Sequence, residues 1–325
     1  MHILIVNNTR IPAFKYGGTE RVIWWLGKEL VKQGHRVTYL VADGSVCDFA
    51  EVLTYNPVIS LQEQIPANVD IIHMHFPTGE EMGYPTITTL HGNVPMGVRL
   101  PMNCVFVSKN HALRHASEVY VHNGLDFEDY GEPGLENERR YYHFLANAAW
   151  RVKNLRGAIE VINKTKEKLV VLGGTRLNFK MGFRFTPYLN IKFRGLVGGE
   201  EKHDLLRHSK GLIFPVLWNE PFGLAVIESL YFGCPVFGTP YGSLPELVTE
   251  EVGFLSASRS ELINKIKSNE FDSSTCHSYA VKNFNSKLMT ERYLILYRKV
   301  INGETLNEVT PTLKENTERF LPFYA

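Results

Sequence analysis

Two carboxylates eight residues apart flank an expected strand-to-helix turn. Glu220 lies on the loop after the apolar run 212–215, and Glu228 lies on the helix expected directly after Gly223. If the whole interval were helical, the two carboxylates would stand roughly 12 Å apart, which leaves room for a diphosphate between them. Pro221 and Gly223 shape a turn whose free N–H groups, at the helix N-terminus, can hold such an anion. One carboxylate could then accept hydrogen bonds from a sugar and the other from a ribose.

A pair of histidines is the other group that could do chemistry. His73 and His75 alternate with Met74, so both imidazoles fall on one face of an expected strand. A protein zinc site takes three or four protein ligands, and no third ligand lies at metal-binding spacing from this pair. We therefore expect no metal site.

Strands and helices alternate along the chain, and these elements would position the residues above. Short apolar runs predict buried strands, and apolar residues at four-residue spacing predict a helix over 18–34. The expected strands of the first half lie at 2–6, 37–41, 71–75, 86–90, 105–107 and 119–121. In the second half we expect strands at 141–145, 168–172, 191–193, 212–215 and 235–237, with helices at 155–164, 199–208 and 224–231.

The length of 325 residues, at roughly 150 residues per domain, predicts two domains. We expect one Rossmann-like domain over 1–135, a second over 136–275, and a C-terminal helix and tail over 276–325 that return toward the first domain. A helical stretch over 275–301 would bury Tyr279, Phe284, Tyr293, Leu296 and Tyr297. The predicted fold class is α/β, with two doubly wound sheets facing a cleft at the carboxyl ends of their strands.

The composition indicates which kinds of partner and which cellular compartment to expect. A net charge of +1 lacks the basic excess of a nucleic-acid binder, so we expect no nucleic-acid partner. The four cysteines contain no C-x-x-C pair, which fits a reducing cytosol. The N-terminus has no basic region of a signal peptide, and no run approaches the roughly 20 apolar residues of a spanning helix. We expect a cytoplasmic protein, and any membrane contact would be peripheral, at the inner membrane face.

The segment 220–228 resembles the E-x7-E motif of the family 4 glycosyltransferases, which are retaining enzymes of GT-B fold. The neighbouring segments 233–236, 242–248 and 253–255 resemble the motifs that follow it in that family. The resemblance is strong over 192–255 and looser at 17–18, 89–92, 107–108 and 123–126. Several ordered motifs that agree are more specific than one motif alone.

The resemblance implies a role for each matching residue of the motif. Glu220 would contact the transferred sugar and Glu228 would bind the ribose. Phe222, Gly223 and Leu224 would offer backbone amides to the donor.

Four further residues take roles from the resemblance. Lys153 resembles the lysine that binds the donor diphosphate, the alternative being a solvated lysine at a helix start. His91 resembles a histidine that touches the donor sugar, although a hydrogen-bonded structural histidine would fit the same position. Gly17 and Gly18 resemble the family's glycine loop, which approaches a phosphate or the acceptor, and a merely flexible loop is the alternative.

One departure concerns the phosphate-binding cations. The family usually has Gly-Arg or Gly-Lys before the lysine, whereas this chain has Asn147 in the run 145–148. The second cation is therefore missing unless Arg151 or Arg194 reaches the site.

The resemblance implies a retaining glycosyltransferase, active in surface polysaccharide or lipopolysaccharide synthesis. It would move a sugar from a nucleoside diphosphate donor, with uridine favoured over guanosine, to a carbohydrate or lipid-linked acceptor. The chain has no D-x-D triplet, the motif through which transferases of the other major fold hold a metal, so we expect no cofactor and no metal. Two alternatives stay open, namely a non-catalytic subunit that binds nucleotide sugars and a GT-B-fold epimerase that acts on the donor alone.

Overall fold

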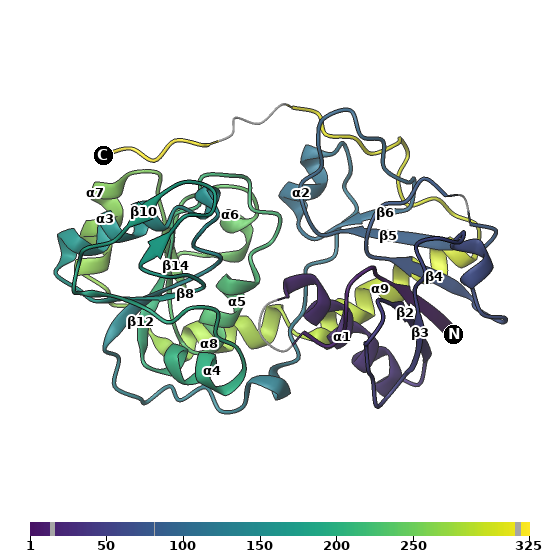
Figure 1. Ribbon diagram of the computed structural model, residues 1–325, viewed down its shortest axis with the longest axis horizontal. Coiled ribbons are helices and arrows are strands. Elements are labelled where there is room, and N and C mark those ends of the chain that lie inside the picture. The colour runs from purple at the N-terminus through teal and green to yellow at the C-terminus, as the bar shows by residue number, and fades with distance from the viewer. Residues whose placement is uncertain (14–16, 81, 316–319) are drawn as a thin grey trace. The chain divides into compact units, whose positions relative to one another are not determined.

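The computed structural model describes residues 1–13, 17–80, 82–315 and 320–325 (Figure 1). Contacts within the chain divide it into two compact units. The first contains Met1–Asp126 and Phe284–Asn316, and the second contains Phe127–Asn283 and Thr317–Ala325. The observed boundaries are thus at 126/127 and 283/284, where the sequence analysis placed them at 135/136 and 275/276.

The first unit is built on a parallel sheet of six strands. In space the order is β3-β2-β1-β4-β5-β6, the order of a doubly wound dinucleotide-type fold. The strands are β1 His2–Val6, β2 Arg36–Val41, β3 Glu51–Thr54, β4 Ile71–Met74, β5 Thr86–Leu90 and β6 Cys104–Phe106. Most of their residues are buried, as expected for strands covered on both faces.

Two long helices pack together in this unit, α1 Gly18–Lys32 and α9 Ser286–Ile301. The helix α1 buries Val22, Leu26 and Leu30 at the four-residue spacing read from the sequence. A glycine lets it approach the sheet, because a Cβ at Gly27 would lie 1.9 Å from the hydroxyl of Tyr39. The remaining helices of the unit are α2 Lys109–Arg114 and a 3-10 turn at Gln62–Gln64.

The second unit repeats the same strand order in a second parallel sheet, β11-β8-β7-β12-β13-β14. Its strands are β7 Tyr141–Leu145, β8 Leu169–Leu172, β11 Ile191–Phe193, β12 Ser209–Phe214, β13 Val236–Gly238 and β14 Gly253–Leu255. A separate antiparallel hairpin pairs β9 Leu177–Asn178 with β10 Arg184–Phe185. Two such parallel sheets confirm the predicted α/β class of two doubly wound domains.

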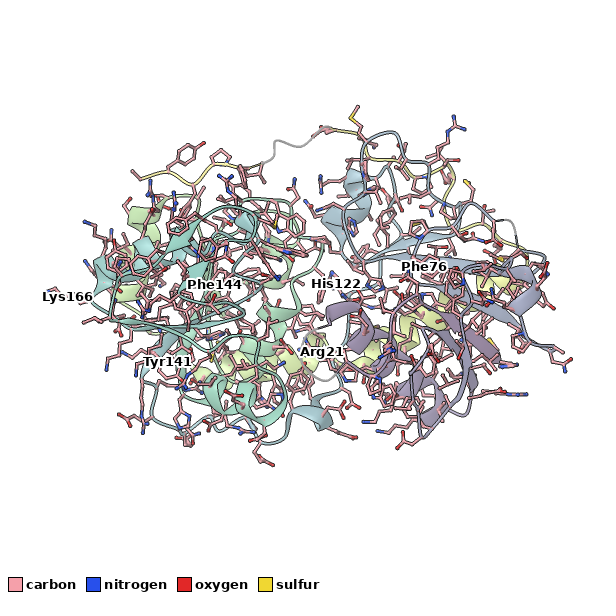
Figure 2. All side chains as sticks on the ribbon, viewed as in Figure 1. Arg21, Phe76, His122, Tyr141, Phe144 and Lys166 are labelled. Atoms are coloured by element: carbon pink, nitrogen blue, oxygen red, sulfur yellow. The ribbon has the colours of Figure 1, made fainter. Side chains whose placement is uncertain are left out.

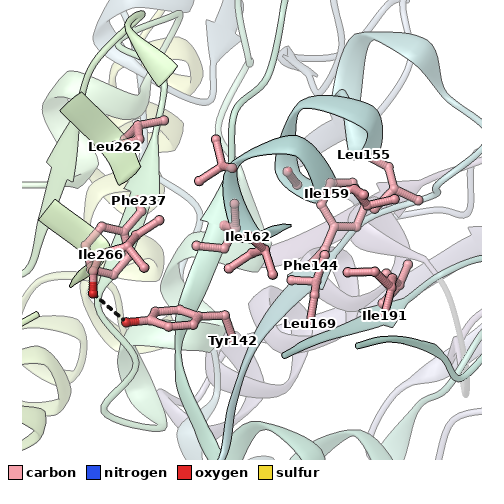
Figure 3. Packing of buried hydrophobic residues seen from close by; sticks show 14 of the residues in the cluster. Tyr142, Phe144, Leu155, Ile159, Ile162, Leu169, Ile191, Phe237, Leu262 and Ile266 are labelled. Carbon is pink, nitrogen blue, oxygen red and sulfur yellow. Dashed lines mark hydrogen bonds between the residues drawn. The ribbon is translucent and has the colours of Figure 1, made fainter. Parts of the chain in front are cut away.

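Helices cover the second sheet, and a large apolar core lies beneath them (Figure 3). The helices are α3 Leu155–Thr165, α4 Gly199–Arg207, α5 Leu224–Tyr231, α6 Leu244–Leu247, α7 Arg259–Lys267 and α8 Ser273–Asn283, with 3-10 turns at Phe127–Tyr130 and Arg151–Lys153. The hydroxyl of Tyr142 donates to the carbonyl oxygen of Ile266, 3.2 Å away. Phe144 is fully buried on the central strand, whereas Lys166 is exposed at the surface (Figure 2).

Two sequence predictions about these elements are wrong. The expected strand 119–121 is only an isolated bridge between Phe106 and Tyr120. The expected helix 275–301 is two helices in different units, α8 and α9, interrupted at Phe284 and Asn285. The Asn285 side chain caps α9 by accepting from the amide of Leu288 at 2.8 Å, while its neighbours pair with Leu125, where the chain leaves the first unit.

Of the residues expected to be buried in that stretch, Phe284, Tyr293 and Tyr297 are buried, while Tyr279 and Leu296 are half-buried. Within the described ranges, no helix has both the length and the apolar character that crossing a bilayer requires.

Candidate active site in the second unit

The turn between β12 and α5 carries both predicted carboxylates. Gly223 stands at the N-terminus of α5 with φ 95°, a conformation that side chains with a Cβ rarely adopt. The helix begins only at Leu224, so the estimate of 12 Å, which assumed a continuous helix from Glu220, does not hold. Both carboxylates are nevertheless buried, Glu220 to 6% and Glu228 to 2% exposure.

Glu220 is held by two donors that converge on one oxygen. Lys153 Nζ lies 2.6 Å and Trp218 Nε1 lies 2.7 Å from Glu220 Oε2. The ammonium also lies 5.3 Å from the ring centre of Phe214 and 5.0 Å from that of Trp218. Lys153 is therefore a buried, paired cation close to two aromatic rings, and the alternative of a solvated lysine at a helix start is wrong.

The loop at residues 242–243 contacts the backbone of the turn that carries Glu220. The amide of Ser243 donates to the carbonyl oxygen of Glu220 at 2.9 Å, and its hydroxyl donates to that of Phe222 at 2.6 Å. Gly242 has φ 65°, and a Cβ there would lie 2.2 Å from the backbone nitrogen of Glu220. In the sequence, the segment 242–248 stands out only as a family motif. Its structural role is to fix the backbone of the turn.

Glu228 is held by residues that the sequence analysis missed. The hydroxyl of Tyr130 lies 2.7 Å and Lys202 Nζ lies 2.6 Å from Glu228 Oε1. The Tyr130 ring in turn stacks on His203, with 5.0 Å between ring centres. The one signal for Lys202 is its helical spacing from Leu206, which places the lysine on the buried face of α4.

The site therefore contains two buried carboxylates, each paired with a buried lysine. Such pairs lose the hydration of both partners, so removing one partner leaves an uncompensated buried charge. Each pair presents a cation and a carboxylate at fixed positions, and the Lys153–Glu220 pair lies close to Gly223 at the start of α5. That arrangement suits a ligand with both phosphates and hydroxyls.

The two arginines considered as replacement cations differ from Lys153 in being exposed. Asn147 accepts a hydrogen bond from the amide of Ala149 at 3.0 Å and so closes its own turn. The Arg151 guanidinium lies over the ring of Phe320, 5.0 Å from its centre. Arg194 is exposed at the end of β11.

The remaining predicted residues lie in the first unit. Gly17 precedes α1, and its carbonyl oxygen accepts from Arg21 Nε at 3.1 Å, while Gly18 is the first residue of the helix. The loop residues 14–16 directly before them lie outside the described residues. His91 follows β5, half-buried, with its Nε2 2.8 Å from Nδ1 of His75.

His91 belongs to a stack of histidines that includes the pair His73 and His75. The rings of His73 and His75 lie 4.1 Å apart on one side of β4, as the alternation predicted. Both ring nitrogens of His73 are hydrogen-bonded, one to the hydroxyl of Tyr297 and one to that of Thr89, each at 2.7 Å. In the part of the chain that the structure describes, no group of three potential ligands could hold a metal ion.

Burial makes this stack sensitive to acid. Desolvation lowers the pKa of His73 to about 3 and that of His91 to about 4, from an ordinary 6.5. The unfolded chain therefore binds more protons between pH 6.5 and 4, so stability is full above 6.5 and falls as the pH falls through this window.

We expect the free energy of local unfolding of β4 and β5 to drop by about 1.4 kcal/mol per pH unit for each such histidine. Hydrogen exchange of their amides at pH 7, 6 and 5 measures this drop. His91→Asn should reduce the slope by one histidine's share. An unchanged slope in that variant would show that His91 is not part of the effect.

Comparison with known proteins points to one class. Residues 126–283, nearly all of the second unit, match the family model of the group 1 glycosyl transferases. The chain is 22% identical to the O-antigen chain mannosyltransferase C of Escherichia coli, with 77% of this chain and 82% of that protein covered.

Solved structures agree on the fold. AviGT4, a glycosyltransferase of avilamycin A biosynthesis, superposes with a TM-score of 0.76 at 19% identity, covering 94% of this chain and 99% of that one. HepE of Anabaena, in complex with UDP and glucose, gives 0.64 at 15%, covering 92% and 100%. At these identities the likeness shows the fold, which is that of the GT-B glycosyltransferases.

Proposed function

We propose that this chain, which has a GT-B fold and matches the group 1 glycosyl transferase model over residues 126–283, moves a sugar from a nucleoside diphosphate donor to a hydroxyl of an acceptor. One observation carries the proposal, namely the buried Lys153–Glu220 pair beside the N-terminus of α5. A lysine in a site poor in water stabilises the charge that develops on a leaving diphosphate.

Each residue of the site has a proposed task. Lys153 and the amides of residues 222–224 hold the diphosphate, and Glu220 accepts hydrogen bonds from the transferred sugar. Glu228 accepts from the ribose. With these groups fixed in advance, catalysis consists mainly of positioning and charge stabilisation, and it retains the anomeric configuration. From the first unit, His91 would touch the sugar, and Gly17 and Gly18 would let the backbone approach a phosphate or the acceptor.

The donor and acceptor classes are also proposals. HepE binds UDP and glucose, which supports a uridine donor over a guanosine one. The Escherichia coli relative acts on O-antigen, which supports a growing carbohydrate or lipid-linked acceptor in surface polysaccharide synthesis. Such an enzyme would work in the cytoplasm, at the inner membrane face, without a metal.

A panel of UDP- and GDP-sugars tests the proposal, with released nucleoside diphosphate followed with and without oligosaccharide or lipid-linked acceptors. We expect acceptor-dependent release that survives excess EDTA. Binding without release would favour the non-catalytic subunit, and an altered donor without acceptor would favour the epimerase. Activity restored only by Mn²⁺ or Mg²⁺ would contradict the task given to Lys153.

Replacing Glu228 by alanine should raise the donor KM by on the order of a hundredfold, because charge-assisted hydrogen bonds to the ribose worth about 3 kcal/mol are lost. A 2′-deoxyribose donor should show a smaller loss. Since Glu228→Ala also leaves Lys202 without its carboxylate, Lys202→Met is the matched control. An equal rise in KM in both variants would mean that the pair positions α5 and does not bind the ribose.

A further inference from the structure

The hairpin β9–β10 turns its apolar face to solvent. Leu177, Phe179, Phe183 and Phe185 alternate with polar residues and are 46%, 74%, 67% and 56% exposed. Leu177 pairs with Phe185 across the hairpin, and the rings of Phe179 and Phe183 lie 5.8 Å apart. A half-buried strand normally places its apolar face toward the core. Here the pattern is reversed.

Polar residues on the other side of the hairpin fix this orientation. Arg176 donates to the carbonyl oxygen of Ile191 at 2.7 Å and to that of Thr186, which is 2% exposed. Arg184 donates to the Thr186 hydroxyl at 3.1 Å. Both guanidinium groups also lie over the ring of Phe193, within 5.8 Å and 5.3 Å of its centre. These contacts of Arg176 and Arg184 hold the hairpin in the orientation that turns its apolar face outward.

The apolar surface continues around the hairpin. The residues with apolar side chains exposed here, which we call the hairpin face, are Leu177, Phe179, Met181, Phe183, Phe185, Tyr188 and Leu189. A cavity of about 750 Å³ lies between β10 and the helices α3 and α7, which Figure 1 shows near one another. Ile159 and Ile263 of these helices line it together with Phe183 and Phe185.

The hairpin segment carries charge of one sign, and Glu160, which also lines the cavity, is paired with Arg259 at 2.6 Å. The segment 168–199 contains six lysines and arginines but not one of the chain's 34 aspartates and glutamates. Lys180 at the hairpin turn is exposed, as are Lys192 and Arg194. A second copy of this chain packed on the same face would bring these cations together, which like-charge repulsion opposes. A negatively charged surface complements them.

We propose that the hairpin face docks this chain on a membrane surface that contains anionic lipids. Phenylalanine, leucine and methionine side chains bury their hydrocarbon at the boundary between headgroups and acyl chains, and the Tyr188 ring can keep its hydroxyl in water there. The surrounding cations are attracted by the negative potential of the leaflet. This docking does not depend on whether the chain transfers a sugar.

Co-sedimentation of the whole chain with lipid vesicles tests the proposal. We expect binding to phosphatidylcholine vesicles in which about a third of the lipid is phosphatidylglycerol, and much weaker binding to pure phosphatidylcholine. Added salt should weaken it. Phe179→Ser/Phe183→Ser and, separately, Lys180→Glu should each reduce the affinity about tenfold.

Matched variants separate docking from general surface change. Val58→Ser/Val309→Ser removes two exposed apolar side chains of the first unit, and Lys267→Glu reverses an exposed charge on α7. Both should bind as the original chain does, and circular dichroism should show all variants folded. Equal binding of the hairpin variants and the controls, or no binding at all, would overturn the proposal. A concentration-dependent dimer that Phe179→Ser/Phe183→Ser abolishes would overturn it in favour of a second copy.

Discussion

Replacing Lys153 by alanine should lower kcat by roughly 10² to 10³ and affect donor affinity less. Charge on the leaving phosphate grows as the glycosidic bond breaks, so a cation at this place acts mainly in the transition state. Of the groups proposed to hold the diphosphate, only the amides of residues 222–224 would remain, because Asn147 is neutral and closes its own turn. Single-turnover kinetics and calorimetric titration with UDP and GDP separate the two effects.

The free energy of unfolding, compared with kcat, distinguishes a role of Lys153 in the transition state from that of a purely structural ion pair. Lys153→Ala leaves Glu220 buried without its cation, which should also cost about 3 to 5 kcal/mol of unfolding free energy. In Lys153→Met/Glu220→Gln the buried charge is gone, so most of the lost stability should return. We expect kcat of that double variant to lie well below that of Glu220→Gln alone, which loses the sugar contact but keeps the Lys153 cation. If kcat and stability recover together, Lys153 only holds the turn.

Replacing Gly242 by alanine should disable the site from a position that we expect to touch no substrate. The added Cβ would lie 2.2 Å from the nitrogen and 2.3 Å from the carbonyl oxygen of Glu220, so the backbone of the turn must move. A displacement of about 1 Å in a positioning element can cost on the order of a hundredfold in rate. We expect kcat/KM to fall by about that factor, and the chain to lose more stability than strain alone explains.

Gly195 supplies the matched control for this variant. Its φ of 69° is close to the 65° of Gly242, but a Cβ there meets no atom within 4 Å. Gly195→Ala should therefore show only the cost of the left-handed conformation, about 1 to 2 kcal/mol, with normal kinetics. Thermal unfolding and steady-state kinetics of both variants make the comparison. Equal effects at the two positions would mean that the contact with Glu220 is unimportant.

The sequence predicted well those features that local pattern determines. The alternation of apolar runs with helical segments predicted the helix Leu224–Tyr231 and the strands Thr86–Leu90 and Ile191–Phe193 with their observed bounds. The break in 275–301 was missed because apolar side chains continue through it. The helix is interrupted there because Phe284 and Ser286 hydrogen-bond to Leu125, a contact between distant parts of the chain.

The same limit applies to the site. Glu220 and Glu228 stand out in the sequence, but their partners lie 67 and 26 positions away, and no local spacing connects them. The role of Lys153 came from a family resemblance, whereas Lys202 and Tyr130 had no such motif to mark them. The importance of Gly242 comes from its close contact with the backbone of Glu220, which only the structure reveals.

The first unit is made of two separate stretches of the sequence, and this determines the order in which the two units can finish folding during translation. Tyr293 and Tyr297 of α9 bind Thr89 and His73 on β5 and β4, so part of its interior is supplied by residues near the end of the chain. Among the described residues of the second unit, in contrast, all the strands and helices lie in one continuous stretch between 127 and 283. Because domains fold as their residues emerge from the ribosome, the half that is translated first is completed last. Until α9 emerges from the ribosome, the polar groups of His73 and Thr89 lack their tyrosine partners. In a nascent chain stalled before residue 286, the unfinished first unit should therefore be accessible to proteases and chaperones.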